Sequence, residues 1–126
     1  MPNHLTNNYA DYLLENGIVY VTYKKGVHIN VEAAMQIVKD RLQIQNGESY
    51  PVLCDARQID YADKPARDYL AIEGSILINA LAYVVNKPYM EMVTEFYVQT
   101  TKPVVVLQKT FLEISEALSF LKKFKT

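Results

Sequence analysis

Alternating and periodic apolar positions divide the chain into strand-like and helix-like segments. Residues 9–15 and 18–23 are rich in Tyr, Val, Ile and Leu, and Asn16 and Gly17 lie between them. An Asn-Gly pair tolerates the positive φ angles of a type I′ turn, so these segments predict an antiparallel hairpin. In the second strand apolar residues fall on both faces, which indicates that both sides of the sheet are at least partly covered.

Strand-like and helix-like segments alternate after the hairpin. The strands are expected at residues 50–56, 80–85 and 104–107. The helices are expected from Val31 to Gln45, from Asp63 to Gly74, from Pro88 to before Pro103, and after Thr110. The order ββαβαβαβα predicts an α/β fold: an N-terminal antiparallel hairpin followed by three parallel-type strand-helix units. Such alternation is typical of a mostly parallel sheet with right-handed crossovers.

Capping residues indicate where the helices should begin. Asn30 precedes the first helical stripe, and Asp63 precedes a segment with Pro65 in its first turn. Thr110 and Glu113 have the spacing of a capping box. We therefore expect Thr110 to cap the last helix.

Composition places the chain among ordinary globular proteins. It has 126 residues, of which 50% are hydrophobic and 21% charged, so we expect a single domain over residues 1–126. Thirteen basic and fourteen acidic residues leave a net charge of −1. No overall field then draws the protein to nucleic acid or to anionic lipid.

Cysteine usage and the first residues bear on the compartment. Cys54 is the only cysteine, so it cannot form an internal disulfide, and the N-terminal segment lacks the basic and apolar regions of a secretion signal. The longest apolar stretch, residues 76–85, is much shorter than the about 20 residues of a membrane helix. We expect a cytoplasmic protein without a membrane span.

One segment resembles a known family. Residues 52–71, VLCDARQIDYADKPARDYLA, resemble the strand-loop-helix centre of STAS domains, the family of bacterial anti-sigma-factor antagonists. A closer resemblance is to small, uncharacterised bacterial STAS-like (SpoIIAA-like) proteins. These share YPVL-D-R on the third strand, an ARDYLA-type helix, a strand ending in Val-Asn and Pro, and a closing helix with EAL-FL. The resemblance covers about residues 15–124 and implies a STAS-like fold.

The chain departs from the antagonists at the start of the second helix. Their pattern there is Asp-Ser-Ser-Gly or similar, with a serine that a partner kinase phosphorylates. The matching residues are Asp63, Lys64, Pro65 and Ala66, so the serine is absent, and with it the phosphate charge that would change partner binding. The resemblance still implies a docking surface around this helix start.

The most polar cluster follows the third strand. Its members are Asp55, Arg57, Asp60, Tyr61, Asp63, Lys64, Arg67 and Asp68. Ligands of open α/β sheets collect beyond the carboxyl ends of strands, so we expect this loop to form one rim with the loops at residues 86–87 and 108–109. The mixed charge favours protein docking over phosphate or nucleic acid.

From this cluster we predict the partner-binding residues. They are Arg57, Tyr61, Asp63, Lys64 and Arg67. Docking at the helix start requires Lys64 and Arg67 to face solvent, while Asp63 caps the helix. The alternative is structural: Asp55 and Arg57 pair with each other or with loop backbone, and Asp63 only caps.

Catalytic, metal and cofactor sites cannot be assembled from this sequence. His4, His28 and Cys54 lack the paired spacing of zinc ligands, and His28 is expected in the loop before the first helix. The serines lack the hydrolase elbow, and the four glycines are too far apart for a phosphate loop. Asp60 and Asp63 could act as acid and base only if burial separated their pKa values. We expect no enzyme, no cofactor and no metal, with Cys54 as a buried apolar residue.

Aromatic and methionine residues leave a rival function open. Residues 88–100 carry Tyr89, Met90, Phe96 and Tyr97 at helical spacing, which fits either core packing or an apolar groove. We predict a non-catalytic, regulatory protein-interaction module whose partner is another protein or a second copy of the chain. The alternative is a binding protein for an apolar small molecule or lipid, with this helix as a movable cover.

Overall fold

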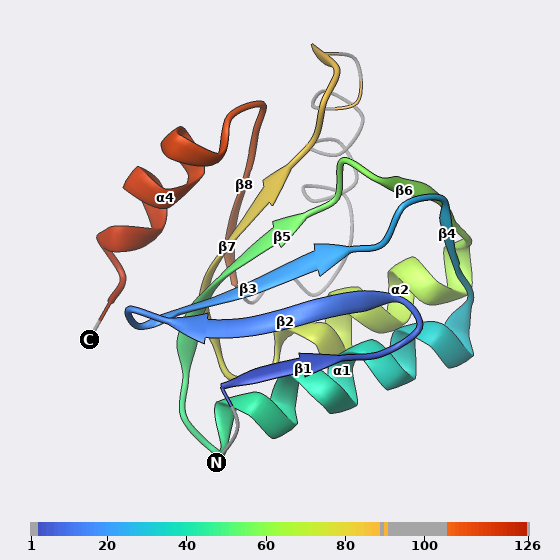
Figure 1. Ribbon diagram of the computed structural model, residues 1–126, viewed down its shortest axis with the longest axis horizontal. Coiled ribbons are helices and arrows are strands. Elements are labelled where there is room, and N and C mark those ends of the chain that lie inside the picture. The colour runs from blue at the N-terminus through green and yellow to red at the C-terminus, as the bar shows by residue number, and fades with distance from the viewer. Residues whose placement is uncertain (1–2, 89, 91–105, 126) are drawn as a thin grey trace.

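The structure is a computed structural model that describes residues 3–88, 90 and 106–125. Its main sheet has six strands in the order β1-β2-β3-β5-β7-β8 (Figure 1). These strands are β1 (His4–Thr6), β2 (Ala10–Glu15), β3 (Ile18–Tyr23), β5 (Tyr50–Asp55), β7 (Ile78–Val84) and β8 (Leu107–Phe111). A separate two-stranded sheet pairs β4 (Val27–Ile29) with β6 (Ile59–Ala62). The helices are α1 (Val31–Gln45), α2 (Lys64–Ile72), the 3-10 turn η1 (Glu73–Ser75) and α4 (Ile114–Lys122).

The sheet has the predicted mixed topology. β2 and β3 are antiparallel, whereas β3, β5, β7 and β8 run parallel to one another. Asn16 and Gly17 connect the hairpin with φ angles of 53° and 77°, which are the positive values that a type I′ turn requires. The predicted α/β class and N-terminal hairpin are confirmed.

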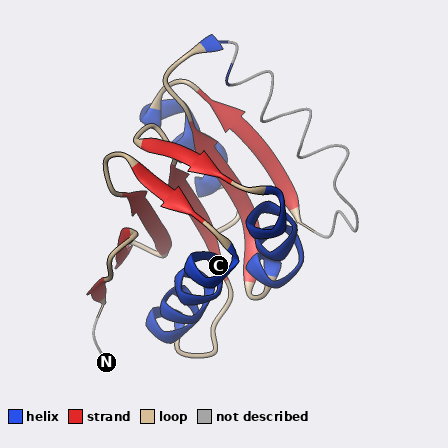
Figure 2. Cartoon of the chain, turned by 90° about the vertical axis from the view of Figure 1, so that its right-hand side faces the viewer, coloured by secondary structure: helices blue, strands red, loops and turns tan. Residues whose placement is uncertain are grey.

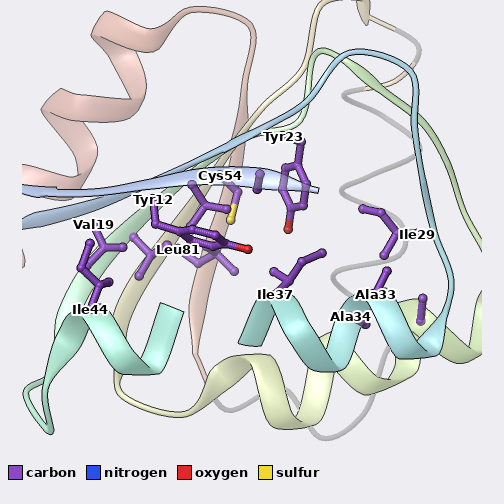
Figure 3. Packing of buried hydrophobic residues seen from close by; sticks show 14 of the residues in the cluster. Tyr12, Val19, Tyr23, Ile29, Ala33, Ala34, Ile37, Ile44, Cys54 and Leu81 are labelled. Carbon is purple, nitrogen blue, oxygen red and sulfur yellow. The ribbon is translucent and has the colours of Figure 1, made fainter. Parts of the chain in front are cut away.

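The core has two parts, one on each face of the six-stranded sheet. Helices α1 and α2 lie on one face and α4 on the other, and Figure 2 shows these layers from the side. On the first face Tyr12 and Cys54 point toward Ile37 of α1 (Figure 3). On the second, Leu53 packs in one cluster with Leu121 of α4. Both faces of β3 are covered in part, as its sequence predicts.

Cys54 is buried, as predicted. Burial raises the pKa of its thiol to about 12, and the nearby positive charge of Arg41 lowers it only in part. Because the thiolate is the nucleophilic form, this cysteine behaves as a small apolar residue of the core.

A buried polar network ties α1 to the connection between α2 and β7. Arg41, which is 4% exposed, donates hydrogen bonds to the carbonyls of Gly74 (3.2 Å) and Ile76 (3.0 Å) and to the side-chain oxygen of Gln45. The Gln45 amide donates to the carbonyl of Leu77 (2.8 Å), whose own φ is 60°. Burial lowers the pKa of Arg41. The network fixes a strained turn that would otherwise leave carbonyls unpaired.

Two expectations about the C-terminal part are wrong. The last strand is β8, at residues 107–111 instead of 104–107, and Thr110 lies within it opposite Tyr83 of β7. The last helix begins at Ile114 after Glu113, without a side-chain capping bond. Pairing with β7 therefore overrides the capping-box pattern. Residues 104 and 105, and the helix expected from Pro88 apart from Pro88 and Met90, lie outside the described residues.

Three short strands were not expected. These are β1, β4 and β6, and His28 consequently lies in β4 and not in a loop. Each is only three or four residues long, which is too short for an alternation pattern to stand out. Each helix in the described part of the chain is too short or too polar to span a bilayer.

Candidate functional site

The predicted site residues lie on one continuous stretch of chain. It leaves the carboxyl end of β5, passes through β6 and enters the first turn of α2. β6 is held by parallel pairing with β4, and the backbone N–H of Asp63 donates to the carbonyl of Ile29 (3.1 Å). A strand and a helix therefore position most of these side chains.

Arg57 folds back on the end of β5. Its Nε and Nη2 donate to the two carboxylate oxygens of Asp55 at 2.8 and 2.6 Å. Burial alone would raise the pKa of Asp55, but the hydrogen bonds and charge of Arg57 outweigh burial and hold the pKa below its ordinary value. The structural alternative for this pair, in which the two side chains bind each other, is thus confirmed.

The rim at the carboxyl ends of the strands forms only in part. The Asn86 amide lies 3.4 Å from the carbonyl of Arg57, so these two loops meet as expected. Residues 108–109 do not join them, because they lie inside β8. Glu113, which follows β8, instead acts electrostatically on Arg57. Arg57 therefore belongs to a rim near the start of α4.

Asp63 is the N-cap of α2, as predicted. Its Oδ1 accepts a hydrogen bond from the backbone N–H of Ala66 at 2.9 Å. The side chain thus satisfies one of the four free N–H groups at the helix start and complements the helix dipole.

Removing this cap should destabilise the protein. We expect Asp63→Ala to lower the free energy of unfolding by about 0.5 to 2 kcal/mol, because the Ala66 N–H loses its partner. Asp68→Ala is the matched control: it removes an exposed carboxylate that pairs with Lys64 in the same helix, a contact worth at most about 0.5 kcal/mol. Urea denaturation of both variants measures the difference, and equal losses would contradict the capping role.

The two basic residues of α2 have different environments. Lys64 is 76% exposed in its side chain, and its Nζ lies 2.8 Å from Asp68. Arg67 is half-buried, and its Nη1 donates to the carbonyl of Ala62 at 2.6 Å. The expectation of a solvent-facing side chain is confirmed for Lys64 and holds only in part for Arg67, whose guanidinium also binds backbone at the junction of β6 with α2.

Tyr61 projects from β6 beside residues that the sequence did not single out together. It is 56% exposed, and its ring meets that of His28 edge-on at 6.1 Å between centroids. The Nε2 atom of His28 lies 2.5 Å from a carboxylate oxygen of Asp60. His28 is paired in register with Tyr61, although the two are far apart in the sequence. Only the β4–β6 pairing brings them together, so no local signal could have found His28.

We call this group the β6–α2 surface. It comprises His28, Asp60, Tyr61, Lys64 and Asp68, with Asp63 and Arg67 as internal supports. It carries two exposed side-chain pairs, His28 with Asp60 and Lys64 with Asp68, and the ring of Tyr61 contacts that of His28. Where the structure describes the chain, no three His, Cys, Asp or Glu side chains gather in a way that could hold a metal ion.

Comparisons with known proteins bear on family and fold. A solved structure from Shewanella loihica PV-4, an uncharacterised protein of the DUF3478 family with a SpoIIAA-like fold, superimposes with a TM-score of 0.65. The two chains share 15% identity over 93% of this chain and 98% of that one, a level that shows the fold alone. This likeness confirms the predicted STAS-like fold. No curated protein matches the sequence.

The family follows from the sequence itself. The model of a domain family of unknown function, DUF7793, matches residues 12–125. That match includes every strand and helix from β3 to α4. The chain therefore belongs to the DUF7793 family.

Proposed function

We propose that this protein is a non-catalytic, regulatory interaction module that docks another protein through the β6–α2 surface. The observation that carries the proposal is Tyr61, a large aromatic side chain left 56% exposed on a short strand and in ring contact with His28, which itself pairs with Asp60. Tyrosine is enriched among the residues that dominate binding energy in protein interfaces. A polar rim around such a residue is typical of docking sites.

The surface is arranged before a partner arrives. Pairing with β4 holds Tyr61, and the Asp63 cap holds the first turn of α2. Side chains fixed on strands and helices lose less conformational entropy on binding than side chains on free loops. A partner therefore meets a preformed site.

The residues have separate roles in this proposal. Tyr61 is the apolar anchor, whereas Lys64 and the His28–Asp60 pair set charge complementarity. Arg67 positions the anchor strand through the Ala62 carbonyl. Arg57 lies on the adjoining rim with Asp55 and contributes only to a partner large enough to reach both places. The helix start carries no serine that a kinase could phosphorylate. We therefore propose that binding and release of the partner, and not phosphorylation, regulate the protein.

The alternative, binding of an apolar small molecule or lipid, stays a prediction. It depends on the helix expected from Pro88 to Thr100, nearly all of which lies outside the described residues.

Site-specific photo-crosslinking in the native host tests the docking proposal. The photoreactive residue p-benzoylphenylalanine replaces Tyr61 in one strain and Ser119, an exposed residue of α4, in another. We expect one protein adduct from position 61 and none of the same mass from position 119. Adding Lys64→Glu should reduce the adduct by about fivefold or more, because reversing a rim charge weakens encounter with a complementary partner.

Folding is controlled within the same experiment. Lys64→Glu should change the free energy of unfolding by less than about 0.5 kcal/mol, since repulsion from Asp68 is offset by the favourable position of an acid in the first helical turn. The proposal fails if both positions give the same adducts, or if Lys64→Glu leaves the adduct at full yield.

A further inference from the structure

The outer sides of α1 and α2 carry apolar residues with no cover among the described residues. Met35 of α1 is 51% exposed and Ile72 of α2 is 50% exposed, and Val31 is also exposed. In Figure 1 these two helices form the layer farthest below the sheet. This face uses other residues than the β6–α2 surface, which it adjoins along α2, since Ile72 follows Asp68 by one helical turn. Contiguous exposed apolar residues on a soluble protein are commonly an interaction site.

A hollow lies in this face. Its volume is about 440 Å³, and its walls come from both helices. It is lined by Glu32, Met35, Gln36, Lys39 and Tyr69. The lining thus combines an exposed methionine and a half-buried tyrosine with one acidic and one basic residue. Methionine is flexible and adapts to apolar surfaces of many shapes.

The charges around Met35 have a symmetric spacing. Glu32 precedes and Lys39 follows the midpoint between Met35 and Gln36 by equal lengths of helix, about 5 Å each way. Residues seven apart lie on the same side of a helix. Both side chains are exposed, and neither forms a salt bridge with another described residue. The face therefore presents opposite charges at equal distances on either side of an apolar centre.

We infer that this face binds a second copy of the chain, as an isologous dimer with its two-fold axis between Met35 and Gln36. Two antiparallel α1 helices then place Met35 in the hollow of the partner subunit. Glu32 faces Lys39 of the partner subunit, and Lys39 faces Glu32 of the partner subunit. A two-fold interface must be self-complementary, and this charge pattern meets that requirement.

Charge favours a second copy over a lipid surface. Binding to an anionic membrane needs a cluster of basic residues, whereas Glu32 and Lys39 line this hollow together. The inference goes beyond the proposed function and uses different residues. If the dimer is not found, the proposed docking function is not contradicted, and the same holds in the other direction.

Sedimentation velocity over a range of concentrations tests the dimer with the full chain. We expect reversible dimerisation with a dissociation constant in the micromolar range. Met35→Glu should weaken it by about tenfold or more, because two carboxylates then lie at the two-fold axis. Ser119→Glu on α4 is the control and should leave the dissociation constant unchanged, since that helix lies on the opposite face of the sheet. Thermal unfolding of each variant confirms that it is folded.

Charge reversals test the arrangement itself. Glu32→Lys alone and Lys39→Glu alone should each lose dimerisation, because each puts like charges opposite one another. An equimolar mixture of these two variants should form a heterodimer. One variant then carries a basic residue and the other an acidic residue at both positions, so opposite charges face each other in both contacts. The double variant Glu32→Lys/Lys39→Glu should also dimerise.

Four results would overturn the inference. A protein that stays monomeric at every concentration has no such dimer. A dimer that survives Met35→Glu uses another face. If the single charge reversals weaken the dimer and the mixture of the two variants does not restore it, the two-fold arrangement is excluded. If added anionic vesicles bind the monomer through Met35, the occupant of this face is a lipid surface.

Discussion

Replacing Arg41 by alanine should lower the free energy of unfolding by about 3 to 5 kcal/mol, because each buried polar group left without a partner costs about 1 to 3 kcal/mol. Three acceptors depend on this guanidinium: the carbonyls of Gly74 and Ile76 and the side-chain oxygen of Gln45. Gln45 is 1% exposed, and the bonds to the two carbonyls are partly shielded from water. Denaturant unfolding measures the loss.

Two further variants separate the hydrogen bonds of Arg41 from its volume. Arg41→Met keeps much of the packing and removes the donors, so it should lose nearly as much stability as Arg41→Ala. Gln43→Ala, on the exposed side of the same helix, should change stability by less than about 0.5 kcal/mol. A loss below about 1 kcal/mol for Arg41→Met would show that the network contributes little.

Leu121→Ala should be nearly as damaging, with an expected loss of about 2 to 5 kcal/mol from lost apolar transfer and the cavity left behind. Leu121 has no exposed surface and packs in one cluster with Leu53 and Ala82, where α4 covers the sheet. The small alanines of β7 cannot expand to fill the space, so little relaxation is available.

Ser119→Ala is the matched control for Leu121→Ala. Ser119 is exposed on the same helix, and its replacement should change stability by less than about 0.5 kcal/mol. If Leu121→Ala unfolds at the same denaturant concentration as the wild type, α4 is not packed on the sheet as described.

Local signals predicted the parts of the fold that local interactions determine. The Asn16–Gly17 turn and the caps Asn30 and Asp63 each act through neighbouring backbone. The Thr110–Glu113 pattern failed because Thr110 has a competing partner, Tyr83, distant in the sequence. A motif of two residues cannot outweigh a ladder of hydrogen bonds that the sequence does not display.

The site shows the same division. Asp63 and Lys64 were predicted from the helix start, and their cap and exposure follow from it. His28 and Arg67 depend on where β4 and β6 lie, so their contacts could not be predicted. The sequence alone indicates only that Arg41 is a polar residue of α1. Tertiary packing brings its guanidinium to the carbonyl of Gly74.

Hydrogen exchange on the complex with the partner crosslinked at position 61 tests the central claim most directly. The account predicts that binding slows amide exchange in residues 59–69, which form β6 and most of α2, and leaves α4 unchanged. An interface slows exchange where it excludes water and suppresses local opening. Slower exchange confined to α4, with residues 59–69 unchanged, would contradict docking through the β6–α2 surface.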